Sequence, residues 1–107
     1  MKVFIYATEG IYQGLHGISN QGVLEVENLE EADWAGVEMS NSLIEEYGLE
    51  DDYYNEEGEY DVEPEFNYSI YAIADEYASM SIEELNDIAD REGHETFIEE
   101  YCGEELI

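Results

Sequence analysis

The number of acidic residues constrains this chain more than any other feature. Thirty Asp and Glu residues stand against only two bases, Lys2 and Arg91, which gives a formal net charge of −28 at pH 7. Like charges oppose compaction, and a chain this charged stays disordered when it has few apolar residues. However, 44% of the residues are hydrophobic and ten are Tyr, and the apolar residues fall into periodic segments. We therefore expect a folded core with an almost wholly negative surface.

This single-sign charge restricts the partners that the chain can meet. A negative surface repels nucleic acid and anionic membranes, and it attracts basic proteins at long range. A single cysteine, Cys102, excludes an internal disulfide framework and the common cysteine-based zinc sites. The N-terminal residues read as a strand rather than a signal peptide, and no apolar run is long enough for a membrane span. We expect a cytoplasmic protein.

Three segments have the composition and periodicity of β-strands. Residues 2–8 carry β-branched and aromatic side chains on both faces, so we expect a central strand. Residues 23–27 alternate apolar and acidic side chains, and residues 67–75 alternate between two largely apolar sets. Together the three segments predict a small, mostly antiparallel sheet.

Three other segments carry helix signals. Asn28 is a candidate N-cap with Glu31 three residues later, and apolar residues then recur at helical spacing. Ser81 begins a capping box that opens a second helix, which we expect Gly93 to end. Thr96 begins a similar box and predicts the start of the last helix.

The length of 107 residues favours a single domain. We expect one α+β domain over residues 1–107, in which two or three helices lie on one side of the small sheet. Residues 49–66, between the first helix and the last predicted strand, are the most acidic part of the chain. We interpret this segment as an acidic loop.

Enzyme chemistry has no specific signal in the sequence. With thirty acids, some pair of carboxylates always looks suitable as a general acid and base, so such a pair is uninformative. His16 and His94 read as solvated or capping residues, and Cys102 as a small buried hydrophobe. No glycine-rich loop carries a lysine that could hold a phosphate. We predict a protein that is not an enzyme and needs no cofactor.

Two alternatives from other classes use the same carboxylates. Residues 50–63 are rich in oxygen ligands suited to calcium, but an EF-hand frame with Gly58 sixth places Tyr53 first and Pro64 last, so it fails at both ends. We therefore predict no dedicated metal site, and a divalent-cation-binding domain stays an alternative. A halophilic surface, on which excess acid maintains solubility in high salt, is the other alternative. Solubility alone does not require the removal of nearly every base, which argues against the halophilic alternative.

The spacing of the acids permits a comparison with DNA. B-form DNA carries one negative charge per ~1.7 Å of axis. Neighbouring positions on a helix surface are ~5–6 Å apart, and alternate residues on one face of a strand are ~6.6 Å apart. A rigid helix and sheet can therefore approximate the charge density of a duplex without its bases. A protein groove that reads mainly backbone phosphate would accept such a surface.

We expect the acidic face of the first helix and the acidic residues 45–65 to form the partner-binding surface. Interleaved aromatic side chains would add apolar contact with the partner. The candidate residues are Glu30, Glu31, Asp33, Trp34, Glu38, Glu45, Glu46, Glu50, Asp51, Asp52, Tyr53, Tyr54, Glu56, Glu57, Glu59, Asp61, Glu63 and Glu65.

Two stretches of the chain carry a family resemblance, and they occur in the same order as in that family. Val3–Ile5 is followed by the turn Tyr12–Gly17, and Tyr71–Tyr77 is followed by Ser81–Asn86. Both stretches resemble ArdA-type antirestriction proteins, which are acidic DNA mimics carried by mobile elements. The present chain is shorter and corresponds to about the N-terminal part of that family.

The resemblance implies a function and a partner. A member of this family would mimic bent B-form DNA in the cytoplasm of a host bacterium and fill the basic DNA groove of a type I restriction–modification enzyme. Family members usually form dimers, so the resemblance also implies a homodimer. The alternative target is a CRISPR effector, because such effectors also hold nucleic acid in a positively charged channel, and an anti-CRISPR protein would block the DNA or PAM site there.

Overall fold

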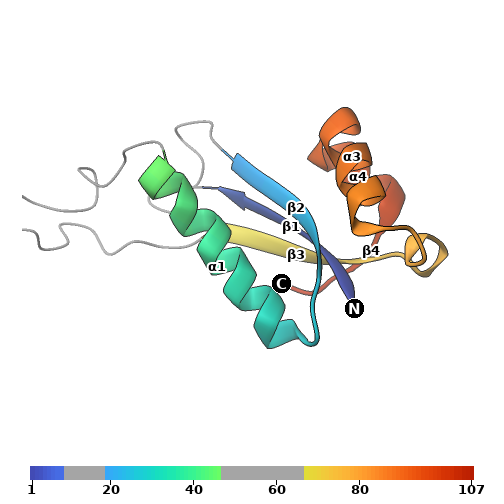
Figure 1. Cartoon of the computed structure of the whole chain (residues 1–107), viewed down its shortest axis with the longest axis horizontal. Helices are drawn as coiled ribbons and strands as arrows, with labels where there is room; N and C mark the ends of the chain where they lie inside the picture. Colours follow the sequence, from blue (N-terminus) through green and yellow to red (C-terminus); the bar gives the residue numbers. More distant parts are fainter. Residues whose placement is uncertain (9–18, 47–66) are drawn as a thin grey trace, which may run out of the picture.

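The computed structural model describes residues 1–8, 19–46 and 67–107, and these residues form a four-stranded antiparallel sheet with three α-helices (Figure 1). This is the single α+β domain that the sequence predicts. No helix in the described ranges is long and apolar enough to cross a membrane. The elements in chain order are β1 (Lys2–Thr8), β2 (Ser19–Glu25), α1 (Leu29–Glu46), β3 (Asn67–Ile73), the 3-10 turn η1 (Asp75–Tyr77), α3 (Ile82–Glu92), α4 (His94–Tyr101) and β4 (Cys102–Glu105).

The first strand is central, as predicted. The strand order is β2-β1-β3-β4, and β1 pairs antiparallel with β2 and β3. Phe4 lies opposite Val23 on β2 and opposite Tyr71 on β3. Val3, Phe4 and Ile5 are all completely buried, which means that both faces of the sheet are covered at this strand.

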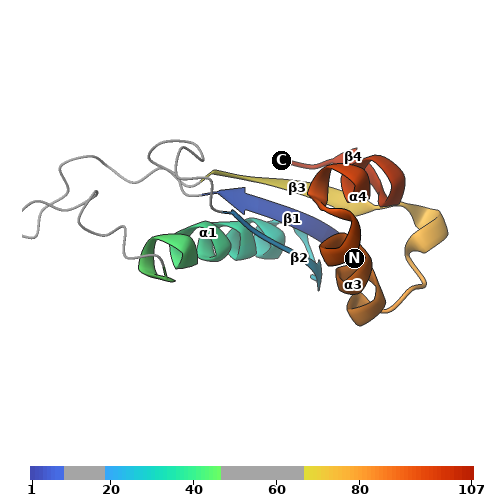
Figure 2. The same ribbon diagram turned by 90° about the horizontal axis from the view of Figure 1, so that it is seen from above.

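Helices pack on both faces of the sheet, so the prediction that they lie on one side is wrong. On one face, Val3, Ile5 and Ile70 form a core with α1. On the other face, Phe4 packs with residues of α3 and α4, including Phe97. Figure 1 shows the strands between α1 and the α3–α4 pair, and Figure 2 shows that pair at the end of the sheet where the N-terminus lies. The cause is visible in β1, whose two apolar faces both require cover.

Two strands differ from their predicted bounds. β2 begins at Ser19 rather than at residue 23 and ends at Glu25 rather than 27, and β3 ends at Ile73 rather than 75. The polar start of β2 has weak strand propensity, but pairing with β1 extends as far as the Thr8–Ser19 pair. Tertiary pairing therefore overrides the local preference.

The C-terminal elements also differ from the prediction. α4 begins at His94, before the expected start at Thr96, and Gly93 with a φ of 88° joins α3 to α4 directly. β4 was not predicted, because its sequence Cys-Gly-Glu-Glu has no strand signal. It pairs with β3, and Leu106 extends the pairing by donating its N–H to the carbonyl of Ile70 at 2.7 Å.

Side-chain caps begin α1 and α3, as predicted. Asn28 Oδ1 accepts the N–H of Glu31 at 2.9 Å, while Glu31 Oε2 accepts the N–H of Glu27 at 2.9 Å. At α3, Ser81 Oγ accepts the N–H of Glu84 at 3.1 Å. Each cap satisfies backbone donors that a helix start would leave unpaired. The acidic first turns of both helices therefore have defined positions.

Candidate partner-binding surface

The acids predicted on α1 lie mainly on its solvent side. Glu30, Glu31, Glu38 and Glu46 are exposed. Glu45 belongs to α1, but its side chain is outside the described set. Apart from Asp33 and Trp34, the other predicted residues lie outside the described ranges: Glu50, Asp51, Asp52, Tyr53, Tyr54, Glu56, Glu57, Glu59, Asp61, Glu63 and Glu65.

Asp33 differs from the other predicted acids because it is partly buried. Its Oδ1 accepts a hydrogen bond from the hydroxyl of Tyr68 on β3. Burial, together with this hydrogen bond and the charge of Asp33, raises the pKa of Tyr68 to about 12. The Asp33 carboxylate therefore helps to hold α1 against the sheet, whereas the other described acids of α1 face solvent.

Trp34 is one of the predicted candidates for the binding surface, and its side chain is 63% exposed. Positions three and four residues apart are neighbours on a helix surface. Glu30, Glu31 and Glu38 stand at these spacings from Trp34 and are exposed. The sole tryptophan of the chain thus shares the exposed surface of α1 with three glutamates.

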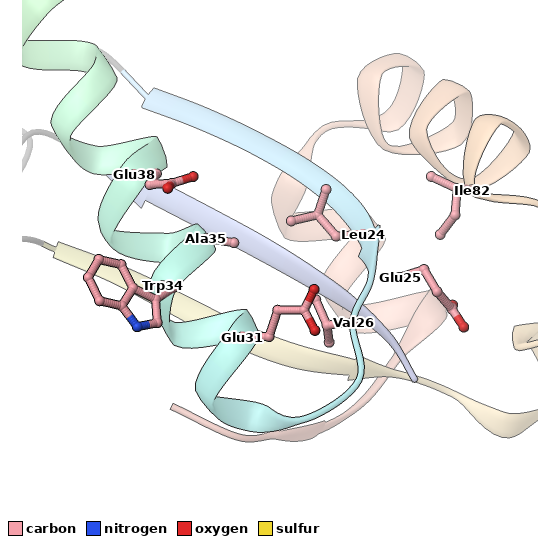
Figure 3. Close-up of a pocket in the computed structure, with 8 residues that line it drawn as sticks. All are labelled: Leu24, Glu25, Val26, Glu31, Trp34, Ala35, Glu38 and Ile82. Carbon is pink, nitrogen blue, oxygen red and sulfur yellow. The ribbon is translucent and has the colours of Figure 1, made fainter.

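A groove lies beside this tryptophan, between α1 and the edge strand β2 (Figure 3). Its volume is about 350 Å³. A second hollow continues it along β2 and shares Leu24, Ala35 and Glu38 with it. The residues that line the first hollow are Leu24, Glu25, Val26, Glu31, Trp34, Ala35, Glu38 and Ile82.

The sequence analysis missed this groove, although it identified Glu31, Trp34 and Glu38. The groove exists because α1 packs beside the edge strand and because Ile82, at the start of α3, reaches the same region. β2 and α1 are consecutive in the sequence, but α3 follows only after β3. No local pattern indicates that Ile82 meets them.

A second group of acids follows β3, and the prediction of the site did not include it. All of these side chains are exposed, and they lie on η1, α3, α4 and β4. The dense acidic composition of residues 75–105 was the signal that could have identified them. They are Asp75, Glu76, Glu83, Glu84, Asp87, Asp90, Glu92, Glu95, Glu99, Glu100, Glu104 and Glu105.

The few positive charges leave this surface almost uncompensated. In the described part of the chain the only ion pair joins the Met1 amino group to Glu25 at 3.5 Å. Lys2 Nζ instead donates to the carbonyls of Ala78 and Met80, at 2.5 and 2.7 Å. Arg91 is exposed in the last turn of α3, where a positive charge interacts favourably with the helix dipole.

The remaining candidates for chemistry have structural environments. The ring of His94 is partly buried and stacks on Tyr6, with a centroid distance of 3.9 Å, so His94 is a packed residue at the start of α4 rather than the solvated or capping residue that was predicted. Cys102 packs against the core of Phe4 and Phe97 as a small hydrophobe, but it is partly buried rather than buried as predicted. Burial raises the pKa of the Cys102 thiol to about 12, and the thiol is therefore protonated at neutral pH.

The described residues thus present an acidic surface with a groove between α1 and β2. Within those ranges no group of three or more His, Cys, Asp or Glu side chains is placed to hold a metal ion. His16 lies outside them. Comparisons of the chain with protein-family models, with curated proteins and with solved structures found no match.

Proposed function

We propose that this protein is a DNA mimic that occludes the basic nucleic-acid-binding groove of a host restriction–modification enzyme. One observation carries the proposal: of the nineteen described acidic side chains all but Asp33 are exposed. The only ion pair among the described residues uses the chain's own N-terminus. These carboxylates therefore do not have to break an ion pair with another side chain before they bind a basic groove.

The acids of α1 alone do not match the charge of a DNA duplex of the same length. Eighteen residues of α-helix extend ~27 Å, and α1 carries six acids along this length. A B-form duplex of the same length carries about 16 phosphate charges. α1 alone supplies less than half of that density. The proposal therefore requires further acids, from the second group after β3 or from the predicted acids of residues 50–65 that follow α1.

The proposed mechanism is competitive occlusion in the host cytoplasm. The long-range field of the acidic surface steers it to the basic groove, and release of bound counterions favours the encounter at low salt. No bond is made or broken, so the function needs neither a cofactor nor a catalytic residue. Inhibition should consequently depend on the sum of many carboxylates rather than on one.

A competition assay tests this proposal. A purified type I restriction–modification enzyme is bound to fluorescently labelled duplex DNA, and the anisotropy of the DNA is followed as the protein is added. We expect full displacement at about 50 mM salt, where electrostatic binding to the basic groove is strongest. An enzyme that keeps its DNA at low salt would contradict the proposal. The same assay with a guide-loaded CRISPR effector tests the alternative target.

A further inference from the structure

We infer that the groove between α1 and β2 is the anchor of this surface and binds an arginine-bearing segment of the basic partner protein. The inference rests on the proposed function, because it identifies the part of the acidic surface on which the partner docks. It adds an apolar and aromatic contact that phosphate mimicry alone does not supply.

The groove has an apolar floor. Leu24 and Val26 come from β2 and its C-terminal end, Ala35 from α1, and Ile82 from the first turn of α3 (Figure 3). Such a floor accommodates the aliphatic stem of a long basic side chain, since these stems lie along apolar surface while the charged head stays at the rim.

The rim of the groove is acidic. Glu25, Glu31 and Glu38 line it, and no basic residue of the described ranges does. Glu31 is already held in place, because its Oε2 accepts the N–H of Glu27. A carboxylate that is positioned before binding loses less conformational freedom when a cation arrives. The charge of the rim therefore selects a positively charged occupant.

Trp34 distinguishes arginine from lysine at this groove. It is the most exposed large hydrophobic side chain of the described residues, at 63%, and the core of the fold does not use it. A planar guanidinium stacks on an indole face and makes paired hydrogen bonds to carboxylates, whereas an ammonium is a compact point charge. The combination of an exposed indole with neighbouring carboxylates therefore fits arginine best.

Trp34 also supplies the readout, because it is the only tryptophan in the chain. Two synthetic peptides of equal length and charge, one with arginine and one with lysine between leucines, are titrated into the full-length protein. We expect a saturable change in tryptophan fluorescence and about threefold tighter binding of the arginine peptide. Equal affinities for the two peptides would overturn the inference.

Three variants locate the binding, with affinities measured by calorimetry and folding checked by circular dichroism. Trp34→Ala should remove the preference for arginine, and Ala35→Leu, which fills the groove without changing its charge, should weaken binding of the arginine peptide. The control Glu99→Gln/Glu100→Gln removes two charges from α4 and should weaken both peptides equally. A preference that survives Trp34→Ala would also overturn the inference.

The competition assay separates this inference from the proposed function. If the Trp34→Ala variant and the unaltered protein displace DNA from the enzyme equally well, the groove is not the anchor, although the proposed mimicry stands. If the unaltered protein does not displace DNA at low salt, the proposed function fails, whatever the peptides show.

Discussion

The side-chain amide of Asn86 makes two hydrogen bonds with the backbone of Val23: its Oδ1 accepts the N–H at 2.7 Å, and its Nδ2 donates to the carbonyl at 3.1 Å. Val23 lies on β2, which is an edge strand. The amide thus pairs with backbone groups of the edge strand as a neighbouring strand would. Gln21 adds a bond in the other direction, donating to the carbonyl of Ala89 at 3.2 Å. Together these contacts attach α3 to the edge of the sheet.

Asn86→Ala should lower the free energy of unfolding by about 2 kcal/mol, because it leaves two partly buried backbone groups of Val23 unpaired. Urea denaturation followed by circular dichroism measures this loss. The matched control is Asp87→Ala, an exposed neighbour on α3 whose removal should change stability by less than about 0.5 kcal/mol. Equal effects of the two substitutions would show that the amide pairing contributes nothing.

Gly36→Ala should destabilise the protein by about 2 kcal/mol, even though alanine is the better helix former by about 1 kcal/mol. A methyl group at Gly36 would overlap the ring of Tyr68, which is held by its hydrogen bond to Asp33. The expected loss is measured by urea denaturation.

The same substitution in a Tyr68→Ala background is its control. Without the ring, the added methyl group has room, and Gly36→Ala should become neutral or stabilising. A double-mutant cycle gives the coupling free energy of the two positions. If the cost of Gly36→Ala were the same in both backgrounds, contact with Tyr68 would not be its cause.

The elements that the sequence predicted well are those with a local cause. The caps at Asn28 and Ser81 and the central position of β1 follow from side chains within a few residues of each other. The C-terminal strand β4 and the polar half of β2 have no such cause, since they are strands only because β3 and β1 pair with them. The error in the placement of the helices has a different origin, because the relevant signal was present in the sequence. Both faces of β1 are apolar, so both faces of the sheet require cover by a helix.

The same distinction applies to the candidate surface. Exposure of Glu30, Glu31 and Glu38 was predictable from their positions off the apolar stripe of α1. Spacing alone could not show that Asp33 would bond to Tyr68, because the contact depends on how α1 packs against β3. The groove beside Trp34 was unpredictable for the same reason, since α1, β2 and α3 all contribute to it.

Stability should fall at alkaline pH partly because of Tyr68. Its pKa is raised from 10.0 to about 12 in the folded protein, so the folded state holds the phenolic proton more tightly than the unfolded state. The stabilisation is complete below pH 10 and is lost as the pH rises through about 12. We expect the free energy of unfolding to fall more steeply in this range for the unaltered protein than for Tyr68→Phe. Parallel pH profiles for the two proteins would exclude this contribution.

Neutralising acids on α1 should reduce inhibition of the restriction–modification enzyme in proportion to their number. The triple variant Glu30→Gln/Glu38→Gln/Glu46→Gln removes three exposed charges from α1. Each phosphate contact contributes ~0.9 to the salt slope of a protein–DNA complex, through counterion release. If all three glutamates act as phosphate mimics, the slope of log affinity of this protein for the enzyme against log salt should become shallower by up to about 3. The competition assay with labelled DNA, repeated at several salt concentrations, measures this slope once the affinity of the enzyme for the DNA is known at each of them.

The matched control for this triple is Glu95→Gln/Glu99→Gln/Glu100→Gln, which changes the net charge equally on α4. If the partner contacts α1 and not α4, the control should retain most of the salt slope and lose affinity only through the weaker long-range field. If both triples lower the slope equally, the partner contacts acids on both faces of the sheet. If neither triple changes the slope, these carboxylates do not replace phosphates, and the net charge has another role, such as the solubility of a halophilic surface. In that case the protein should unfold at low salt and refold only in molar salt, which a thermal melt at increasing sodium chloride would show.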